Sequence, residues 1–269
     1  MSVEHYENFP VASVLLPRPL RHPVAVIYRF ARTADDFADE GDRPAAERLA
    51  LLEGYREELR RLAAGRPTGS ALFAELRAVV AHHDLPFEPF HDLLDAFSQD
   101  VTKPRYASFA EVLDYCRRSA DPIGRLMLHL YGRVTDEHVA WSDSICSALQ
   151  LTNFWQDVAI DFAKNRIYLP QDEMARFGVS EAQIAARDPG GGWAALIAFQ
   201  IDRTRAMLER GAPLALALPG RIGLEIRAVV QGGLRILEKI ERVRGDVFRS
   251  RPVLRAWDWP LLLGRAVAM

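Results

Sequence analysis

Apolar residues recur three and four positions apart along most of this chain, which is the period of an α-helix with one buried face. Alternating runs rich in β-branched residues, which would indicate strands, are nearly absent. The pattern therefore predicts an all-α fold with short breaks between the helices. We place the first helix start at Pro23, because proline is favoured in a first turn. The expected helices cover residues 23–40, 45–64, 70–84, 87–98, 108–132, 136–165, 193–217, 221–246 and 253–268.

The first of these helices carries a stripe of polar residues near its end. Tyr28, Arg32, Asp35 and Asp39 advance by four, three and four positions, so they share one helical face. A phenol, a guanidinium and two carboxylates are costly to bury in an apolar core, yet they suit a metal-bound anion whose oxygens match the fork of an arginine. The alternative is a solvated helix end in which the aspartates pair with Arg32.

A second polar stripe follows about 120 residues later. It consists of Gln150, Asn153, Asp157 and Asp161, again at three and four spacing, and the residues between them are mostly apolar. That composition favours a buried helix whose polar face must be satisfied by a partner. Lys164 and Arg166 follow the stripe, where they either balance a diphosphate or cap the helix C-terminus.

Both stripes end with two aspartates four positions apart. Carboxylates at this spacing lie on one face, separated by roughly 6 Å of helical rise, and they repel each other unless cations bridge them. If the two turns face each other, Asp35, Asp39, Asp157 and Asp161 form a cage for Mg²⁺, which prefers carboxylate, water and phosphate oxygens. The spacing thus predicts a magnesium site whose remaining ligand is a phosphorylated substrate.

Composition narrows the function classes. The net charge of −2 over 269 residues gives no basic footprint for nucleic acid. Cys116 and Cys146 lack metal-ligand spacing, which fits a reducing cytosol, and no apolar run is long enough to span a membrane. We expect one domain over residues 1–269 in a cytoplasmic protein. The segment from Trp257 to Leu263 is either core or a face for peripheral contact with the inner membrane.

At this point the residues resemble a known family. Asp35-x-x-x-Asp39, Asn153-x-x-x-Asp157-x-x-x-Asp161 and Arg166-Ile167-Tyr168-Leu169-Pro170 are similar to motifs of the squalene/phytoene synthase family. The resemblance spans nearly the whole chain, since Asp100-x-x-x-x-Arg105-Tyr106 and the segment 115–124 also match. Within that family, residues 5–13, 153–157 and 251–263 are most similar to the bacterial hydroxysqualene synthases of hopanoid biosynthesis.

The resemblance implies an isoprenoid synthase fold around a central cavity, in which two or three Mg²⁺ ions join the acidic motifs to a diphosphate. The implied substrate is presqualene diphosphate, and water traps the rearranged cation as hydroxysqualene without NADPH. It also implies coupling to a presqualene diphosphate synthase and a hydroxysqualene dehydroxylase. Tyr28 and Arg32 would donate to the departing oxygens, Asn153 would orient a carboxylate, and Gln156 or Asn8 would position the trapping water. The substrate-contacting residues would be Asn8, Phe30, Arg105, Tyr115, Ala120, Gly124, Gln150, Arg166 and Tyr168, with Phe154 as further lining.

Departures from the family pattern bear on the reaction. Many members that condense two prenyl diphosphates carry Arg before the equivalent of Asp157, whereas this chain has Gln156, with Glu7 and Asn8 near the N-terminus. Fewer cationic groups favour one diphosphate over two. Two other interpretations stay open: a head-to-head condensing enzyme that makes phytoene, dehydrosqualene or presqualene diphosphate, and a catalytically silent helical assembly factor on the same fold.

Overall fold

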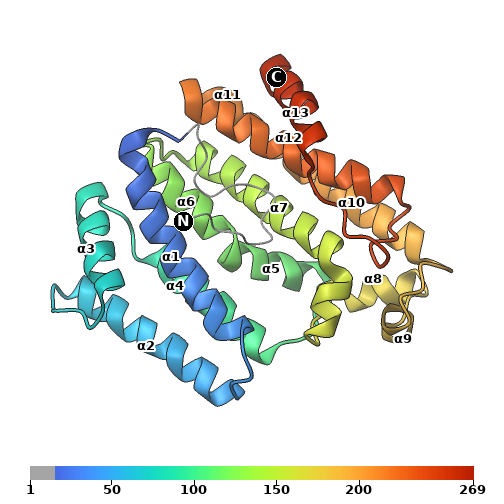
Figure 1. Cartoon of the computed structure of the whole chain (residues 1–269), viewed down its shortest axis with the longest axis horizontal. Helices are drawn as coiled ribbons and strands as arrows, with labels where there is room; N and C mark the ends of the chain where they lie inside the picture. Colours follow the sequence, from blue (N-terminus) through green and yellow to red (C-terminus); the bar gives the residue numbers. More distant parts are fainter. Residues whose placement is uncertain (1–15) are drawn as a thin grey trace.

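The computed structural model describes residues 16–269, and these form a helical assembly without any strand (Figure 1). A single isolated bridge between Arg105 and Ile167 is the sole β-type pairing among them. The predicted all-α fold is therefore confirmed. The long helices are α1 (Arg18–Asp39), α2 (Ala45–Ala63), α3 (Ala71–His83), α4 (Glu88–Thr102), α5 (Phe109–Ser119), α6 (Asp121–Leu130), α7 (Asp136–Ala163), α10 (Trp193–Gly211), α12 (Gly220–Arg242) and α13 (Trp259–Ala268), and the short ones are α8 (Gln171–Arg176), α9 (Glu181–Ala185), α11 (Leu214–Ala217) and the 3₁₀ turn η1 (Ala256–Asp258).

Prolines account for most differences from the expected helices. The first helix begins at Arg18, because Pro19 rather than Pro23 occupies its first turn. The helix expected over 108–132 is divided into α5 and α6 just before Pro122, whose ring nitrogen cannot donate a helical hydrogen bond. Pro213 separates α10 from α11 in the same way. The short helices α8 and α9 lie in a stretch where no helical period was recognised.

The long helix α7 lies at the centre of the molecule and contacts α5, α6, α10 and α12 (Figure 1). It begins behind Thr135, whose side-chain oxygen accepts a hydrogen bond from the amide of His138 at 3.1 Å and so caps the first turn. Its expected bounds of 136–165 agree with the observed ones to within two residues at the C-terminus. The second polar stripe is thus carried on a buried central helix, as its apolar neighbours predict.

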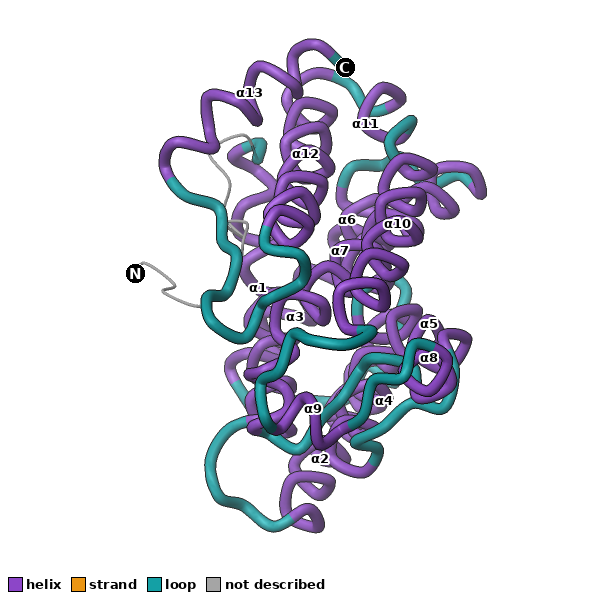
Figure 2. Tube along the Cα trace, turned by 90° about the vertical axis from the view of Figure 1, so that its right-hand side faces the viewer, coloured by secondary structure: helices purple, strands orange, loops and turns teal. Residues whose placement is uncertain are grey.

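The buried side chains form two clusters, which meet where α4, α6 and α7 pack together. One cluster belongs to α1–α4 with Leu126 and Leu130 of α6. The other joins α5, α7, the C-terminal helices and Leu128 of α6. In the side view, α1 to α4 and α10 to α13 occupy different parts of the molecule (Figure 2). The single-domain interpretation stays a prediction, and no helix among the described residues is long and apolar enough to cross a membrane.

Gly211, at the end of α10, allows a close approach to the central helix. A Cβ atom there would lie 2.6 Å from the Trp141 carbonyl oxygen and 2.5 Å from Ile145 Cγ1 of α7. We expect Gly211→Ala to lower the free energy of unfolding by about 1–3 kcal/mol, because a backbone carbonyl cannot move aside without separating the helices. Denaturant unfolding measures the change.

Gly54 in α2 provides the matched control, since nothing lies within 4 Å of a Cβ built on it. Gly54→Ala should instead stabilise the protein by about 0.5–1 kcal/mol, because alanine restricts the unfolded chain. Equal effects of the two substitutions would contradict the close-packing argument.

Candidate active site

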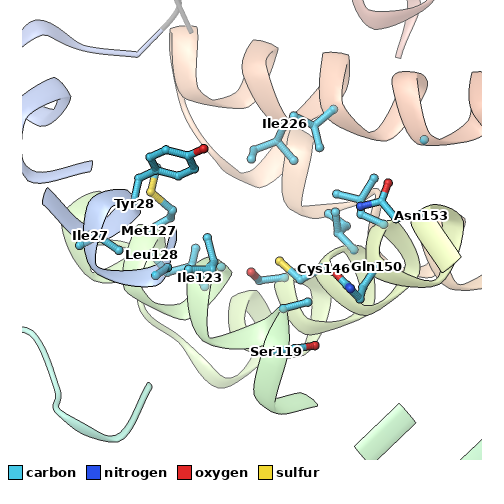
Figure 3. Close-up of a pocket in the computed structure, with 18 of the residues that line it drawn as sticks. Ile27, Tyr28, Ser119, Ile123, Met127, Leu128, Cys146, Gln150, Asn153 and Ile226 are labelled. Carbon is cyan, nitrogen blue, oxygen red and sulfur yellow. The ribbon is translucent and has the colours of Figure 1, made fainter. Parts of the chain in front are cut away.

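A cavity of about 570 Å³ lies where the two buried clusters meet. Its wall comes from α1, α4, α5, α6, α7, α11 and α12, so segments far apart in the sequence surround one space. Figure 3 shows Ile27 and Tyr28 of α1 facing Met127 of α6, with Cys146, Gln150 and Asn153 of α7 opposite Ile226 of α12. The volume is within the range of about 300–1,000 Å³ that is typical of small-molecule sites.

The first acidic motif enters this cavity from α1. Tyr28, Arg32 and Asp35 all line the wall, as their shared stripe predicts. Arg32 contacts Asp35 at 3.3 Å and Asp36 at 2.6 Å, while its buried Nε has no hydrogen-bond partner among the described residues. Burial raises the pKa of Asp35, although the charge of Arg32 opposes this shift. The stripe therefore carries two groups that lack full compensation. The guanidinium of Arg32 has an unused donor, and burial disfavours the charged form of the Asp35 carboxylate.

The second acidic motif is carried by α7. Gln150 and Asn153 line the cavity, and Asp157 and Asp161 continue the same face toward the helix end. Arg251 binds Asp157 with both a short Nε contact and an Nη2–Oδ2 contact of 3.0 Å. Burial, with the charges of Asp157 and Asp100, raises the pKa of Asp161 well above its ordinary value. Among residues 16–269, no hydrogen bond or ion pair is made by the Asp161 carboxylate.

The ends of the two motifs lie side by side. Lys164 and Arg166, which directly follow α7, both form ion pairs with Asp39 at the end of α1. The charges of Arg166 and Lys164 also act on Asp35. Basic side chains therefore screen carboxylates that would otherwise repel across the gap. Helix capping is not the role of these two cations here, because each reaches across to the other motif.

A fifth carboxylate, Asp100 at the end of α4, connects the site to two tyrosines. Its side chain is 4% exposed and accepts hydrogen bonds from the hydroxyls of Tyr115 and Tyr168, the latter at 2.9 Å. Arg166 lies 3.8 Å away. Burial raises the pKa of Asp100 to about 7, and the charge of Asp35 adds to the shift. Our list of site residues omitted Asp100; the segment Asp100-x-x-x-x-Arg105-Tyr106 was the signal that could have included it.

Comparison with known proteins agrees with this geometry. Residues 3–258 match the family model for squalene/phytoene synthase. This chain belongs to the squalene/phytoene synthase family. It is 35% identical to a hydroxysqualene synthase of Rhodopseudomonas palustris over 237 residues, covering 87% of this chain and 80% of that protein. It is also 29% identical to a 15-cis-phytoene synthase of Synechococcus elongatus, covering 96% of this chain and 87% of that one.

Solved structures give the same family. The squalene synthase HpnC of Alicyclobacillus acidocaldarius superposes with a TM-score of 0.83 at 38% identity, covering 90% of this chain and 91% of that one. A dehydrosqualene synthase crystallised with a ligand has the same TM-score at 21% identity, over 94% of this chain and 88% of that one, which shows the shared fold. The protein is thus an enzyme of the squalene/phytoene synthase type, related to prenyltransferases.

Several of the residues that the sequence predicts for the active site line the cavity. Besides Tyr28, Arg32, Asp35, Gln150 and Asn153, they are Tyr115, Ala120 and Gly124. Asp39, Asp157 and Asp161 lie beyond the residues that line it. Gly124 allows α6 to approach α7, since a Cβ on it would lie 2.3 Å from Ser142 Oγ and 2.6 Å from Cys146 Sγ. Their contact with substrate stays a prediction. Asn8 lies outside the described residues.

Two aromatic residues that we expected in the wall are packed elsewhere. Phe30 is fully buried among Tyr55, Phe73 and Phe90, with ring centroids 5.2–5.8 Å away. It lies two positions after Tyr28, which is roughly 200° around the helix and away from the cavity. Phe154 stacks on Tyr168 with centroids 3.7 Å apart. Helical phase excludes Phe30 from the lining, whereas Phe154 is absent from it because the ring packs on Tyr168.

Gln156 is also placed differently from our expectation. It is 1% exposed and its amide nitrogen donates to the Pro252 carbonyl, so it holds the C-terminal segment beside the Arg251–Asp157 ion pair. It does not line the cavity, and a role in placing the trapping water is therefore not supported. Long-range packing of residues 251–252 on α7 produced this outcome, which helical spacing alone could not predict.

Arg105, Arg166 and Tyr168 lie behind the wall of the cavity. Arg105 forms a bidentate ion pair with Glu181 at 2.8 and 2.9 Å and donates to the Asn165 carbonyl. It thereby fixes the loop that carries Arg166 and Tyr168. Direct contact of Arg105 with substrate is not supported, whereas Arg166 and Tyr168 contact the carboxylates Asp39 and Asp100 of the site.

Proposed function

We propose that this protein is a hydroxysqualene synthase, which ionises presqualene diphosphate and adds water to the rearranged cation. The observation that carries the proposal is one cavity with two ends of different chemistry. Arg32, Asp35 and Asn153 lie in the part of the wall that adjoins the two acidic motifs, which we call the polar end, while most of the remaining lining is apolar and includes Met127 and Ile226. Such a site suits a long hydrocarbon that carries one anionic head.

The carboxylates of the polar end fit magnesium by their chemistry. They are hard oxygen donors divided between two helices, and Mg²⁺ ordinarily completes its shell with water and phosphate oxygens. Among the described residues no three acidic, histidine or cysteine groups converge as a ready-made metal site, so a substrate diphosphate would have to supply part of the shell. Asp35, Asp39, Asp157 and Asp161 would hold the metal. When bound, Mg²⁺ supplies positive charge to the leaving diphosphate.

A charge count supports one diphosphate. Six aspartates and four basic residues gather at the polar end, which leaves two negative charges when all are ionised. With two or three Mg²⁺ ions bound, the net charge of the polar end would become two to four positive charges. That balances one diphosphate ester, with about three negative charges, and falls short of two such groups. The groups counted are Asp35, Asp36, Asp39, Asp100, Asp157 and Asp161, with Arg32, Lys164, Arg166 and Arg251.

The chain supplies donors to the departing oxygens. Arg32 has a buried Nε that no described residue satisfies, and Tyr28 presents its hydroxyl on the same stripe. A donor aimed at the position where negative charge develops stabilises the transition state without reorganisation. Lys164 and Arg166, which hold Asp39 here, would turn to the diphosphate once metal binds that carboxylate.

The apolar wall protects the cation from side-chain nucleophiles. Ile123, Leu149 and Val229 present only saturated carbon to it. Cys146 also lines the cavity, but burial raises the pKa of its thiol to about 12, which keeps it protonated. We assign water as the nucleophile that adds to the cation. Its addition is redox-neutral, so the reaction needs no NADPH.

The substrate and product place the enzyme between two others. A presqualene diphosphate synthase would supply the cyclopropylcarbinyl diphosphate, and a hydroxysqualene dehydroxylase would consume the alcohol. The relatives named hydroxysqualene synthase from Rhodopseudomonas palustris and Zymomonas mobilis, at 35% and 34% identity, support this assignment.

The test is to incubate the purified protein with presqualene diphosphate and Mg²⁺, without NADPH, in heavy-oxygen water. We expect hydroxysqualene that carries one heavy oxygen, together with free diphosphate, and no product when the metal is chelated. Mass spectrometry of the lipid fraction measures both the product and its label. Asp42→Asn, on the exposed loop after α1, serves as the control variant with unchanged yield.

The rival interpretations predict other results. The phytoene synthases among the relatives give weight to head-to-head condensation. Formation of presqualene diphosphate from farnesyl diphosphate, or of phytoene from geranylgeranyl diphosphate, would show a condensing enzyme instead. A protein that releases no diphosphate from any of these substrates would be a silent helical assembly factor.

A further inference from the structure

Exposed apolar side chains are concentrated at the C-terminal end of the chain. Among the described residues, nine large hydrophobic side chains are strongly exposed, and six of these lie between residues 243 and 267. Trp257 is 65% exposed, Leu263 48% and Val267 73%. Tryptophans with this exposure are costly to leave in water unless a partner covers them.

Three of these side chains form one stripe on α13. Trp259, Leu263 and Val267 recur every four residues, so they lie along one side of the helix, and Trp257 of η1 precedes them. The neighbouring line of Leu262 and Ala266 is fully buried against the rest of the protein. We call Trp257, Trp259, Leu263 and Val267 the C-terminal apolar surface. Two different views place α13 at the edge of the molecule, with α12 as its main packing partner (Figures 1 and 2).

The charge around this surface is strongly positive. Residues 242–269 contain six arginines and two aspartates, although the whole chain has a net charge of −2. One of the two aspartates, Asp258, is buried in contacts with Arg235 and Lys239. Arg255 stacks on the Trp257 ring at 5.0 Å, and Arg249 is 83% exposed. An exposed apolar stripe with arginines and tryptophans beside it is typical of helices that lie in the surface of an anionic bilayer.

We propose that the C-terminal apolar surface docks this protein on a membrane that contains anionic lipids. Trp257 and Trp259 enter the headgroup region, Leu263 and Val267 reach the acyl boundary, and Arg249 and Arg255 contact the lipid phosphates. An acidic protein is disfavoured as the occupant of this surface. Its charges would pair with the arginines but would leave the leucine, valine and tryptophan side chains uncovered. The inference does not depend on which prenyl diphosphate is the substrate.

The surface is held in place from the protein side. Asp258 accepts hydrogen bonds from Arg235 Nε at 2.9 Å, from Lys239 and from the Arg255 amide at 2.8 Å. Arg265, on the other flank of α13, pairs with Glu238 of α12 at 2.6 Å. Ion pairs with α12 therefore hold η1 and α13, which carry the C-terminal apolar surface, in place. The same helix α12 supplies Ile226 and Val229 to the cavity wall.

Flotation of the full-length protein with vesicles tests the proposal. We expect binding to vesicles of phosphatidylcholine with phosphatidylglycerol. Binding to vesicles of phosphatidylcholine alone should be weaker by about tenfold or more. Trp257→Ser with Leu263→Ser should weaken binding to the anionic vesicles at least tenfold. Arg249→Gln with Arg255→Gln should reduce binding and its dependence on salt.

Matched controls come from exposed residues elsewhere. Val134→Ser and Leu216→Ser remove large apolar side chains that are 45% and 56% exposed, and Arg43→Gln removes a charge at the start of α2. These variants should bind vesicles as the unmodified protein does. All variants should retain the same thermal midpoint, because each altered side chain is on the surface.

Three results would overturn the proposal. They are absence of binding to anionic vesicles, equal binding by the Trp257→Ser and Leu263→Ser variant, and a concentration-dependent dimer that this variant abolishes. The last, measured by sedimentation, would identify the surface as a contact between copies of the chain. None of these outcomes bears on the formation of hydroxysqualene in detergent, so the two proposals fail independently.

Discussion

Asp161→Asn should lower the rate of diphosphate release about a thousandfold while making the metal-free protein more stable. The carboxylate lies at the end of α7, where burial and the charges of Asp157 and Asp100 raise its pKa well above the ordinary value. The charged form is thus disfavoured in the folded protein. An amide of the same shape removes that penalty, and we expect a gain of about 1 kcal/mol at neutral pH.

The loss of activity has a separate cause. If Asp161 holds Mg²⁺, its neutral isostere weakens the positive charge presented to the leaving diphosphate, and a thousandfold change corresponds to about 4 kcal/mol. Thermal melts with Mg²⁺ and inorganic diphosphate provide a second measurement. These ligands should raise the melting temperature of the unmodified protein but not that of the variant, because only the former binds them tightly.

Asp202→Asn is the matched control, since this aspartate is 73% exposed on α10 and, among the residues that the structure describes, pairs with Arg205 alone. It should change neither rate nor stability. An Asp161→Asn variant that is less stable and fully active would show that the acidic end of α7 has a structural role alone.

Asp258→Asn should destabilise the protein by about 3–5 kcal/mol, because it breaks a buried ion network by removing one partner. Asp258 is 1% exposed and connects η1 to Arg235 and Lys239 of α12. Lys239 also donates to the Val253 carbonyl at 2.7 Å, so the same network holds the segment before η1. Denaturant unfolding measures the loss, and faster hydrogen exchange in α13 would locate it.

The same network predicts a dependence on pH. Burial alone would raise the pKa of Asp258, but the contacts with Lys239, the Arg255 amide and Arg235 outweigh it and lower the pKa to about 2. A group whose pKa is lowered on folding stabilises the protein above its unfolded value of 3.8, and that stability is lost as the pH falls toward 2. The Asp258→Asn variant should lack this component. Equal acid sensitivity of both proteins between pH 4 and 2 would contradict it.

Helical spacing predicted much of the candidate site. It assigned Tyr28, Arg32 and Asp35 to one face and Gln150 with Asn153 to another, and all five line the cavity. The reason is local, because 3.6 residues per turn determine which side chains share a face wherever the helix lies. Phe30 was misplaced even though the same rule puts it on the opposite side of α1 from Tyr28.

Spacing could not predict which charges meet. Asp39 pairs with Lys164 and Arg166, which follow it by more than 120 residues, and Asp157 pairs with Arg251. Asp100 joins the cluster through Tyr115 and Tyr168 from two other elements. Such contacts depend on how α1, α4 and α7 pack, and no local pattern records that packing.

Most of the helices, their polar faces and the need of those faces for a partner can be predicted from the chain alone, because they follow from side-chain chemistry and the helical period. Three other features depend on how the helices pack: the contact of Gln156 with the C-terminal segment, the place of Asp100 in the site, and the exposure of Trp257 and Trp259. Burial and charge pairing are set by residues distant in the chain, so they arise only when the helices are packed together.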